Sequence, residues 1–473
     1  MNKENADKKR EEGPVFDTER LIPTYFKMAL PVVLSMVVTL VYNLADTYFI
    51  ARTNDPFLVA GVSLCAPLFM ALMAVGNIFG QGGNSLIARL LGANDRESTR
   101  RISSFCFWTA IALGLVLSIP LLVFRGPFLD LLGASEDTLS HAEAYYTVIS
   151  AGAPLIIVSF IHSNLIRSEG MATHSMAGTI AGAVLNIILD PLFISVFGWG
   201  ARGAALATVL GYVLTDVLCL IFVLQKSRAL SVRLSHFRVK WGEFRQIISV
   251  GFTAALTNIA SSVCLVFMNQ FLKPYGDDKI AALGIVMKIT MVVQLILVGF
   301  SFGGVPLFGF LYGAGEEKKL RKLIRFCTLF LTALAFAESV LVFLLAEPLM
   351  RVFIKDAAIV ADGSVMLRWQ IAGMAFAGIV LLYTCLFQAG GKALQALILS
   401  LSRQGILFIG VFFLLTSLLK YQGFLMSQPA ADLFSALLAI LLFRIHSDDN
   451  RSPAWRPEAR NSKHGRDSGS RGL

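Results

Sequence analysis

Stretches of about 20 apolar residues recur along almost the whole chain, and a helix of that length spans the hydrocarbon core of a bilayer. Of the 473 residues only 15% are charged and 56% are hydrophobic, and the mean hydropathy is +0.68. A soluble domain carries roughly 25% charged residues. The composition therefore predicts an all-α polytopic membrane protein and excludes a large soluble enzyme.

Twelve membrane-spanning helices are predicted from the apolar runs. Their approximate ranges are 25–50, 58–85, 102–124, 142–166, 174–197, 203–225, 245–271, 280–311, 323–346, 366–388, 394–418 and 423–444. The hydrophilic residues 1–22 contain no cleavable signal peptide, so the first span is expected to direct insertion.

The positions of lysine and arginine predict the orientation. If both termini lie on one side, that side holds most of the basic residues, including the tail after Ile445. Basic loops remain in the cytoplasm, so both termini are predicted to be cytoplasmic in a cell (inner) membrane protein. Because the net charge of +10 comes from short loops and tails, a nucleic-acid partner is not expected.

The two halves of the chain repeat at one constant offset. Gly92-Ala93 returns as Gly313-Ala314, and at the same spacing Phe105-Cys106 returns as Phe326-Cys327. An ungapped repeat of six spans predicts two pseudo-symmetric lobes that rock against each other. The predicted parts are a tail (1–22), an N-lobe (23–225), a linker (226–242), a C-lobe (243–445) and a basic tail (446–473).

Two carboxylates lie inside apolar spans, Asp46 in the first and Asp190 in the fifth. Burying a charge at membrane depth is costly, and such residues usually handle protons or cations. At the repeat offset Asp190 falls on Val411, so ion coupling is predicted for the N-lobe alone. Two other interpretations remain open: Asp46 hydrated at the headgroups, and Asp190 as a helix-end residue before Pro191.

Several polar residues are predicted to share the level of these carboxylates. Asn186 and Tyr42 each lie one helical turn before an aspartate, and Thr208 and Tyr145 fall at a similar depth. Oxygen donors of this kind suit Na⁺, with Asp46, Asn186, Asp190 and Thr208 as its ligands. Two close, dry carboxylates would instead hold a proton, and the sequence does not choose between the two ions.

Four other charged residues also lie within predicted spans. Asp216 and Asp432 are candidates for the inner vestibule, whereas Lys288 and Arg403 are interpreted as structural. The six cysteines form no CxxC motif and are interpreted as buried apolar residues.

Over residues 20 to 445 the chain resembles the multidrug and toxic compound extrusion (MATE) transporters, and within them the DinF-like and MepA-like branch. The resemblance rests on YNLADTYFIA, LNIILDPLFI, GARGAALATVLG, SLSRQG and GFLMSQPAAD, and on the doubled architecture. It implies a V-shaped pair of lobes that exports cationic or amphipathic drugs in exchange for H⁺ or Na⁺.

The resemblance also implies roles for individual residues. It assigns an N-lobe coupling network, and it assigns Pro31 to the bending of the first span. The network residues are Tyr42, Asp46, Tyr145, Asn186, Asp190 and Thr208. The family's asparagine pair in the fourth span is not matched, because Ser163 and Phe160 occupy the expected places beside Asn164.

The leading hypothesis is therefore a monomeric secondary-active antiporter that uses H⁺ or Na⁺ and needs no other cofactor. The alternative is a flippase for lipid-linked precursors, which would favour a strongly basic central cleft, whereas Lys288, Arg368 and Arg403 are the main basic candidates within spans. A membrane-embedded enzyme is not expected, because the chain has no HExxH motif or clustered ligands, and a P-loop for ATP is absent.

Overall fold

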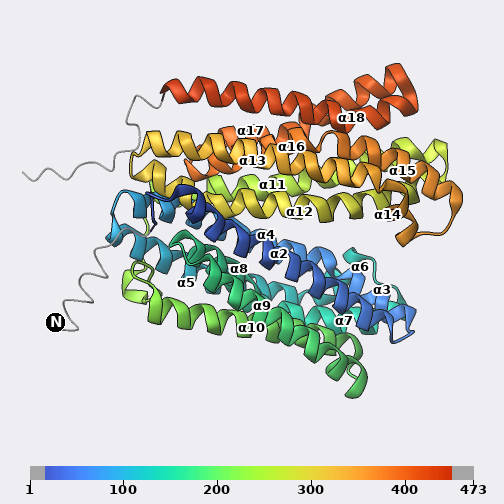
Figure 1. Cartoon of the computed structure of the whole chain (residues 1–473). Helices are drawn as coiled ribbons and strands as arrows, with labels where there is room; N and C mark the ends of the chain where they lie inside the picture. Colours follow the sequence, from blue (N-terminus) through green and yellow to red (C-terminus); the bar gives the residue numbers. More distant parts are fainter. Residues whose placement is uncertain (1–15, 450–473) are drawn as a thin grey trace, which may run out of the picture.

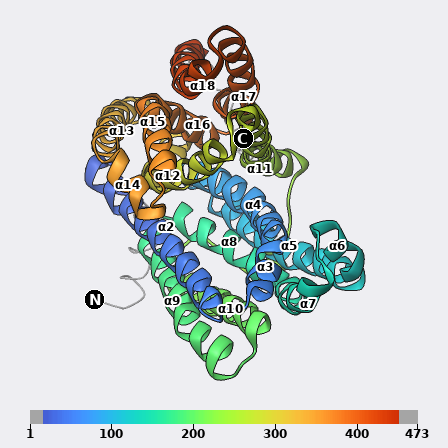
Figure 2. The ribbon, with the colours of Figure 1, turned by 90° about the vertical axis from the view of Figure 1, so that its right-hand side faces the viewer.

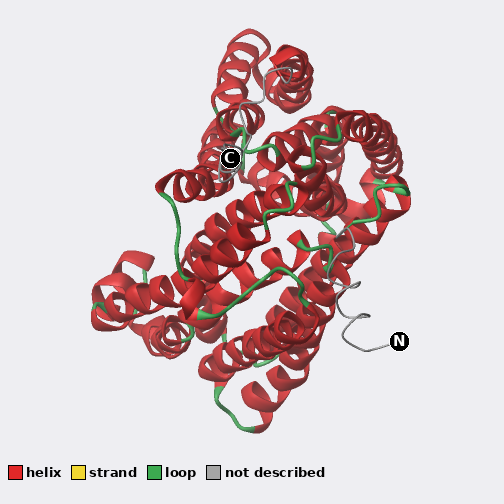
Figure 3. Cartoon of the chain, turned by 90° about the vertical axis from the view of Figure 1, so that its left-hand side faces the viewer, coloured by secondary structure: helices red, strands yellow, loops and turns green. Residues whose placement is uncertain are grey.

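The computed structural model describes residues 16–449, which form helices joined by short loops (Figure 1). No strand occurs in that range (Figure 3). Residues 1–15 and 450–473, which make up most of the two predicted tails, lie outside it. The described part of the chain confirms the predicted all-α polytopic architecture.

The N-lobe contains the first six membrane passes. Its elements are α2 (Leu21–Ala51), α3 (Pro56–Leu64), α4 (Ala66–Gly92), α5 (Arg96–Val123), α6 (Arg125–Leu132), α7 (Glu136–Ala151), α8 (Ala153–Ser168), α9 (Ala172–Asp190), the π-helix η1 (Pro191–Val196) and α10 (Gly200–Lys226). α3 with α4, α7 with α8, and α9 with η1 each form one pass, and α6 is a short helix between passes.

The C-lobe follows a linker that contains the short helix η2 (Leu234–His236). Its elements are α11 (Trp241–Leu272), η3 (Lys273–Tyr275), α12 (Asp277–Gly313), α13 (Glu317–Leu344), α14 (Ala346–Phe353), α15 (Ala357–Ala372), α16 (Met374–Ala389), α17 (Ala393–Arg403) and α18 (Ile406–Asp449). The two lobes lie side by side, with α2 and α4 of the N-lobe next to α11 and α12 of the C-lobe (Figure 2).

Twelve passes result from these helices. Within residues 16–449, eight segments are long and apolar enough to cross a membrane, and two bent helix pairs raise the number to ten. One of the eight segments, Ala393–Ile445, makes two passes, because Lys420 (φ 52°, ψ −124°) turns the chain back within α18 (Figure 1). Helix α11 supplies the remaining pass.

The repeat is visible in the helix boundaries. At the offset that relates Gly92 to Gly313, the starts of α5, α6, α7, α8 and α9 recur as the starts of α13, α14, α15, α16 and α17. The bends recur as well: the fourth pass bends by 54° at Gly152, and the tenth by 45° at Gly373. The offset read from the sequence therefore describes the geometry of both lobes.

The lobes meet at one end of the bundle, here called the near end, where α2 begins and α18 ends; the opposite end is the far end (Figure 1). Tyr25 donates to the carbonyl of Phe300 (3.0 Å), and the Ser85 hydroxyl donates to the carbonyl of Gln388. Arg89, which is 3% exposed, donates to the carbonyl of Gly390 (3.3 Å). These contacts hold the two lobes together at the near end.

Two glycines allow this closure. A Cβ at Gly92 would overlap the backbone oxygen of Phe310, and a Cβ at Gly313 would overlap that of Arg89. The two glycines are related by the repeat offset, so α4 and α12 cross through equivalent points. Only glycine permits so close an approach of two helix backbones.

The linker is attached to the N-lobe. Ser103, Ser104 and Trp108 of α5 donate to the carbonyls of residues 231, 233 and 232, at 3.1, 2.7 and 3.0 Å. The Glu169 carboxylate, in the turn between α8 and α9, accepts from the backbone N–H groups of Arg228 (2.6 Å) and Ala229 (2.9 Å) and from the Ser227 hydroxyl. Burial raises the pKa of the Glu169 carboxyl, and these three hydrogen bonds act in the opposite direction.

We expect Glu169→Ala to release the linker, because it leaves two backbone donors without their acceptor. A lost buried acceptor costs about 2 kcal/mol, or roughly a thirty-fold rise in local opening. Limited trypsin cleavage at Arg228 and Arg233 measures this opening. Glu169→Gln retains an acceptor oxygen for the two N–H groups and is expected to stay near the wild-type rate; equal cleavage of the alanine variant and the wild type would contradict the prediction.

Candidate functional site

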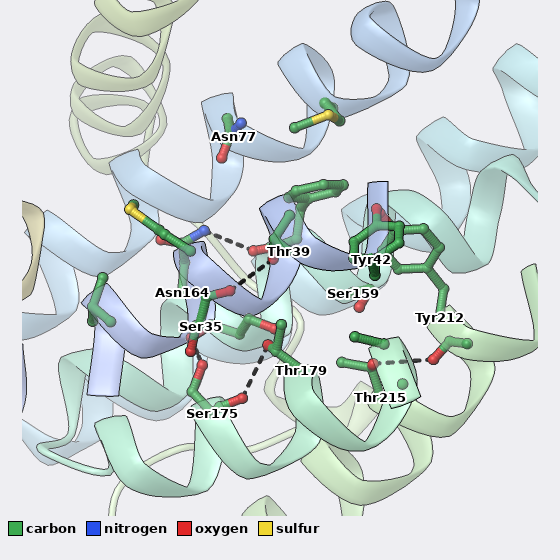
Figure 4. A pocket seen from close by; sticks show the side chains of 18 of the residues that line it. Ser35, Thr39, Tyr42, Asn77, Ser159, Asn164, Ser175, Thr179, Tyr212 and Thr215 are labelled. Atoms are coloured by element: carbon green, nitrogen blue, oxygen red, sulfur yellow. Dashed lines mark hydrogen bonds between the residues drawn. The ribbon is translucent and has the colours of Figure 1, made fainter. Parts of the chain in front are cut away.

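A cavity of about 380 Å³ lies inside the N-lobe, between α2, α4, α8, α9 and α10, and reaches α12 of the C-lobe. Its volume is in the range of small-molecule sites. Figure 4 shows hydroxyl, phenol and amide side chains from these N-lobe helices converging on this space. Phe69, Phe160, Tyr212 and Phe302 add aromatic surface to the wall.

Sequence reasoning missed one wall of the cavity. Asn77, Gln81 and Asn84 all line it from α4. Their spacing of four and then three residues places them on one helical face. This spacing could have been recognised in the sequence as a polar face on the second span. Because α4 also forms the closed contact at the near end, this amide face connects the cavity to the interface between the lobes.

The two predicted carboxylates lie near each other. Each is one helical turn beyond a lining residue, Tyr42 or Asn186, toward the far end of the bundle. Asp190 is 0% exposed, and the Asn186 amide donates to its Oδ1 at 3.4 Å. Asp190 and Asp46 are close enough to repel electrostatically. Among the described residues, Oδ2 of Asp190 and Oδ1 of Asp46 are buried without a hydrogen-bond partner.

Two other interpretations were left open by the sequence: a hydrated Asp46 at the headgroups, and a helix-end role for Asp190. The α-helix α9 ends at Asp190, and the chain continues directly into the π-helix η1 at Pro191, so the helical pass extends beyond this residue. A π-turn is a usual way to accommodate a proline, which has no N–H to give to the preceding turn. Asp46 is partly buried on α2, with one oxygen enclosed in protein, which differs from a hydrated headgroup position.

Tyrosines surround the carboxylates. Tyr42 interacts electrostatically with both aspartates, and so does Tyr145 of α7. The Tyr42 hydroxyl is 3.3 Å from that of Tyr212 on α10. Tyr212 was not predicted, although it lies one turn beyond Thr208 on the same helix.

The remaining predicted residues are placed as follows. Thr208 is buried and lines the cavity with Asn186 and Tyr42. Pro31 lies inside the unbroken helix α2. The Ser35 hydroxyl donates a hydrogen bond to the backbone carbonyl of Pro31 at 2.8 Å. The structure thus brings Tyr42, Asp46, Tyr145, Asn186, Asp190 and Thr208 into one region of the N-lobe.

Metal-binding chemistry is limited. Across residues 16–449 no group of three or more histidine, cysteine, aspartate or glutamate side chains could hold an ion. The oxygens of Asp46, Asn186, Asp190 and Thr208 are the donors near which a monovalent cation would be held, and such oxygen donors suit Na⁺ rather than a transition metal. The six cysteines are buried and unpaired.

In the C-lobe one buried carboxylate, Asp432, is paired with an arginine. Arg403 Nε donates to Oδ1 of Asp432 at 2.9 Å, and Gln428 donates to the same oxygen at 3.1 Å. The side chains of the pair are 13% and 2% exposed. Arg403 lies where the eleventh pass is interrupted between α17 and α18, and Gln404 there accepts from Ser261 of α11 at 2.7 Å. The two charges of the pair therefore compensate each other within the C-lobe.

We expect Arg403→Met to destabilise the protein by about 3–5 kcal/mol, because it leaves the Asp432 charge buried without a partner. The double variant Arg403→Met, Asp432→Leu removes both charges and should recover most of that loss. Thermal unfolding of the purified variants in detergent measures both effects. A double variant as unstable as the single one would show that the pair contributes packing rather than charge compensation.

Comparisons with known proteins agree with this architecture. The MatE family model matches residues 31–192 and 253–440, so it covers both halves of the repeat. The multidrug export protein MepA of Staphylococcus saprophyticus is 31% identical over 440 residues, which cover 93% of this chain and 97% of that protein. The similarity therefore extends over nearly the full length of both chains.

Solved structures share the fold. A MATE transporter in the bent conformation superposes with a TM-score of 0.85 at 24% identity, covering 91% of this chain and 96% of the other. An outward-facing multidrug resistance MATE transporter of the MOP superfamily gives 0.83 at 24% identity, with the same coverage. Because the family model matches both halves and the relatives align along nearly the whole chain, this protein belongs to the multidrug and toxic compound extrusion (MATE) family of multi-pass membrane transporters.

Proposed function

We propose that this transporter exports small amphipathic organic compounds in exchange for inward-moving H⁺ or Na⁺. The observation that carries the proposal is the pair Asp46 and Asp190, which share one buried region of the N-lobe. At the repeat offset their C-lobe counterparts are Phe267 and Val411. The carboxylate pair therefore occurs in the N-lobe and is not repeated at the equivalent positions of the C-lobe, which supports an ion-coupling site in the N-lobe.

Electrostatics supports the coupling role. Two carboxylates this close in a low-dielectric region repel each other, so at least one is neutralised by a proton or by a cation. Taking up or releasing that cation changes the charge of the N-lobe by one unit. A change of this size, next to the cavity wall, can favour one arrangement of the lobes over another.

The similarity to multidrug exporters supports the substrate class. MepA proteins are multidrug exporters, and this chain shares their length and has a cavity with both aromatic and polar walls. Such a wall suits amphipathic organic molecules of several shapes. We propose the same class for this chain.

The direction of transport follows from the orientation that we propose. Basic loops lie at the near end, so that end is cytoplasmic, and both termini with it. The protein then sits in the cell (inner) membrane as a monomer, since each chain contains both lobes. Because the lobes are in contact at the near end, we propose that the described conformation is closed toward the cytoplasm.

Transport by the purified protein in liposomes tests the proposal. A fluorescent amphipathic dye is followed while a Na⁺ gradient or a pH gradient is imposed. We expect movement against the dye gradient under one of the two conditions, and loss of that movement when the gradient is collapsed. Absence of movement under both gradients would overturn the antiport and favour lipid-precursor translocation instead.

A further inference from the structure

The N-lobe cavity has one ionised side chain in its wall. Of the described residues that line it, Arg167 alone is charged at neutral pH; the others are amides, hydroxyls, phenols and apolar groups. Asp46, Asp190 and Asp216 lie beside the cavity and are not part of this lining. The wall is therefore cationic, which a site built only for organic cations would not need.

Arg167 has no carboxylate partner among the described residues. Its Nε donates to the carbonyl of Ser163 (3.0 Å) and one terminal nitrogen donates to the Asn164 side-chain oxygen (2.9 Å). None of the ion pairs within 4.0 Å in residues 16–449 includes it. The nearby Glu169 carboxylate is occupied by the linker. A half-buried guanidinium in a membrane protein is costly when no anion accompanies it.

The repeat shows that the fold itself does not require this charge. The C-lobe counterpart of Arg167 at the repeat offset is Gln388, which lies at the same place on α16 and is 4% exposed. The buried arginine of the C-lobe, Arg403, has a carboxylate partner at 2.9 Å. At this repeat position only the N-lobe carries an arginine, and no carboxylate lies within 4.0 Å of it among the described residues. This placement points to an anion that comes from outside the chain.

We infer that Arg167 binds the carboxylate of the transported compound, and that the preferred substrates are zwitterionic amphipaths that carry such a group. The inference rests on the proposed function and specifies its substrate. The hydrogen bonds to Ser163 and Asn164 use two of the five N–H donors of the guanidinium, which leaves donors for a carboxylate. The apolar rings of the compound would then lie against Phe160, Tyr212 and Phe302.

A matched pair of dyes tests the inference: a rhodamine with a free carboxylate, and its own methyl ester. Binding to the purified full-length transporter in detergent is followed by fluorescence anisotropy, without any ion gradient. We expect the wild type to bind the acid at least about tenfold more tightly than the ester, as a charge-assisted hydrogen bond contributes. In Arg167→Gln the affinity for the acid should fall roughly 10- to 100-fold, while the affinity for the ester stays within about twofold.

Three comparisons separate charge from structure. Arg167→Lys retains the charge and should recover part of the preference for the acid. Arg202→Gln, at an exposed position of α10, removes the same charge from the lobe and should leave both affinities unchanged. Retained binding of the ester by Arg167→Gln shows that its cavity is intact.

The outcomes are decisive without transport data. A wild type that does not prefer the acid overturns the inference even if Arg167→Gln fails to fold. An equal loss of acid and ester binding in Arg167→Gln overturns it as well. Because no gradient is applied, failure of H⁺ or Na⁺ coupling does not alter these results, so the proposed antiport and the carboxylate site fail separately.

Discussion

Asp190→Asn is expected to reduce gradient-driven export at least about 100-fold while the protein remains folded. The substitution preserves the size of the side chain and can keep the contact with Asn186, but it removes the charge that must bind and release H⁺ or Na⁺. Without that exchange the gradient has no means of driving the lobes. Asp46→Asn is expected to have the same effect, because both carboxylates belong to one electrostatic pair.

The measurement is dye transport in liposomes under the gradient that drives the wild type, together with equilibrium dye binding in detergent. Binding should persist within a few fold, since neither aspartate lines the cavity. Asp130→Asn is the matched control: this aspartate lies exposed on α6 of the same lobe, and its loss should leave export unchanged. Wild-type export by both Asp46→Asn and Asp190→Asn would remove the coupling site from the N-lobe.

The second large effect is expected at the near-end crossing of α4 and α12. Gly313→Leu places a side chain against the backbone oxygen of Arg89, which no rotamer change can move. Overpacking against a flexible side chain costs roughly 1–3 kcal/mol. Against backbone the simplest relief is separation of the two helices, so we expect the near end to stay open and export to fall more than about tenfold.

Cysteine labelling can report this opening directly. The six native cysteines are buried, so an added Ser85→Cys, which lies at the crossing and is 0% exposed in the wild type, gives a readable signal. Maleimide labelling of that cysteine should be at least about tenfold faster with Gly313→Leu than without it. Gly284→Leu on the same helix meets only open space and serves as the control. Equal labelling in both backgrounds would contradict the proposed closure.

The sequence predicted the fold well because the two strongest signals act over long segments. Apolar runs determine where a helix can cross a bilayer, and the constant repeat offset fixes the relation between the halves. The predicted spans were nonetheless too short at many ends: the fourth was expected at 142–166, whereas the helices cover Glu136–Ser168. Polar turns that extend helices beyond the apolar core have no hydropathy signal.

The spans predicted from the sequence were continuous and did not include the breaks that the structure shows within them. The bends at Gly152 and Gly373, the break at Cys65 and the π-helix after Asp190 all lie inside apolar runs. Their positions depend on which neighbour each half-helix packs against, and a hydropathy profile does not contain that information. Prolines gave a local cue at three of these breaks, Pro67 after Cys65, Pro154 after Gly152 and Pro191 after Asp190.

The coupling residues were easier to predict than the cavity. A carboxylate in an apolar run stands out by its cost, so Asp46 and Asp190 could be singled out. Tyr212, Gln81 and Arg167 are ordinary polar residues near helix ends or faces, and their importance depends on which side of the helix meets the cavity. The pairing of Arg403 with Asp432 also weakens the flippase hypothesis, because that basic group is not available for a phosphate.

The attachment of the linker limits how far the lobes can move apart. Hydrogen bonds hold residues 227–233 on the N-lobe, Phe237 contacts the ring of Phe105, and α11 begins at Trp241. Only residues 238–240 connect these two anchors, and four Cα–Cα steps span at most roughly 14 Å. The linker is thus a short tether that travels with the N-lobe. It sets an upper bound on the opening of the near end, and shortening or stiffening it would reduce the stroke of the transporter without altering either binding site.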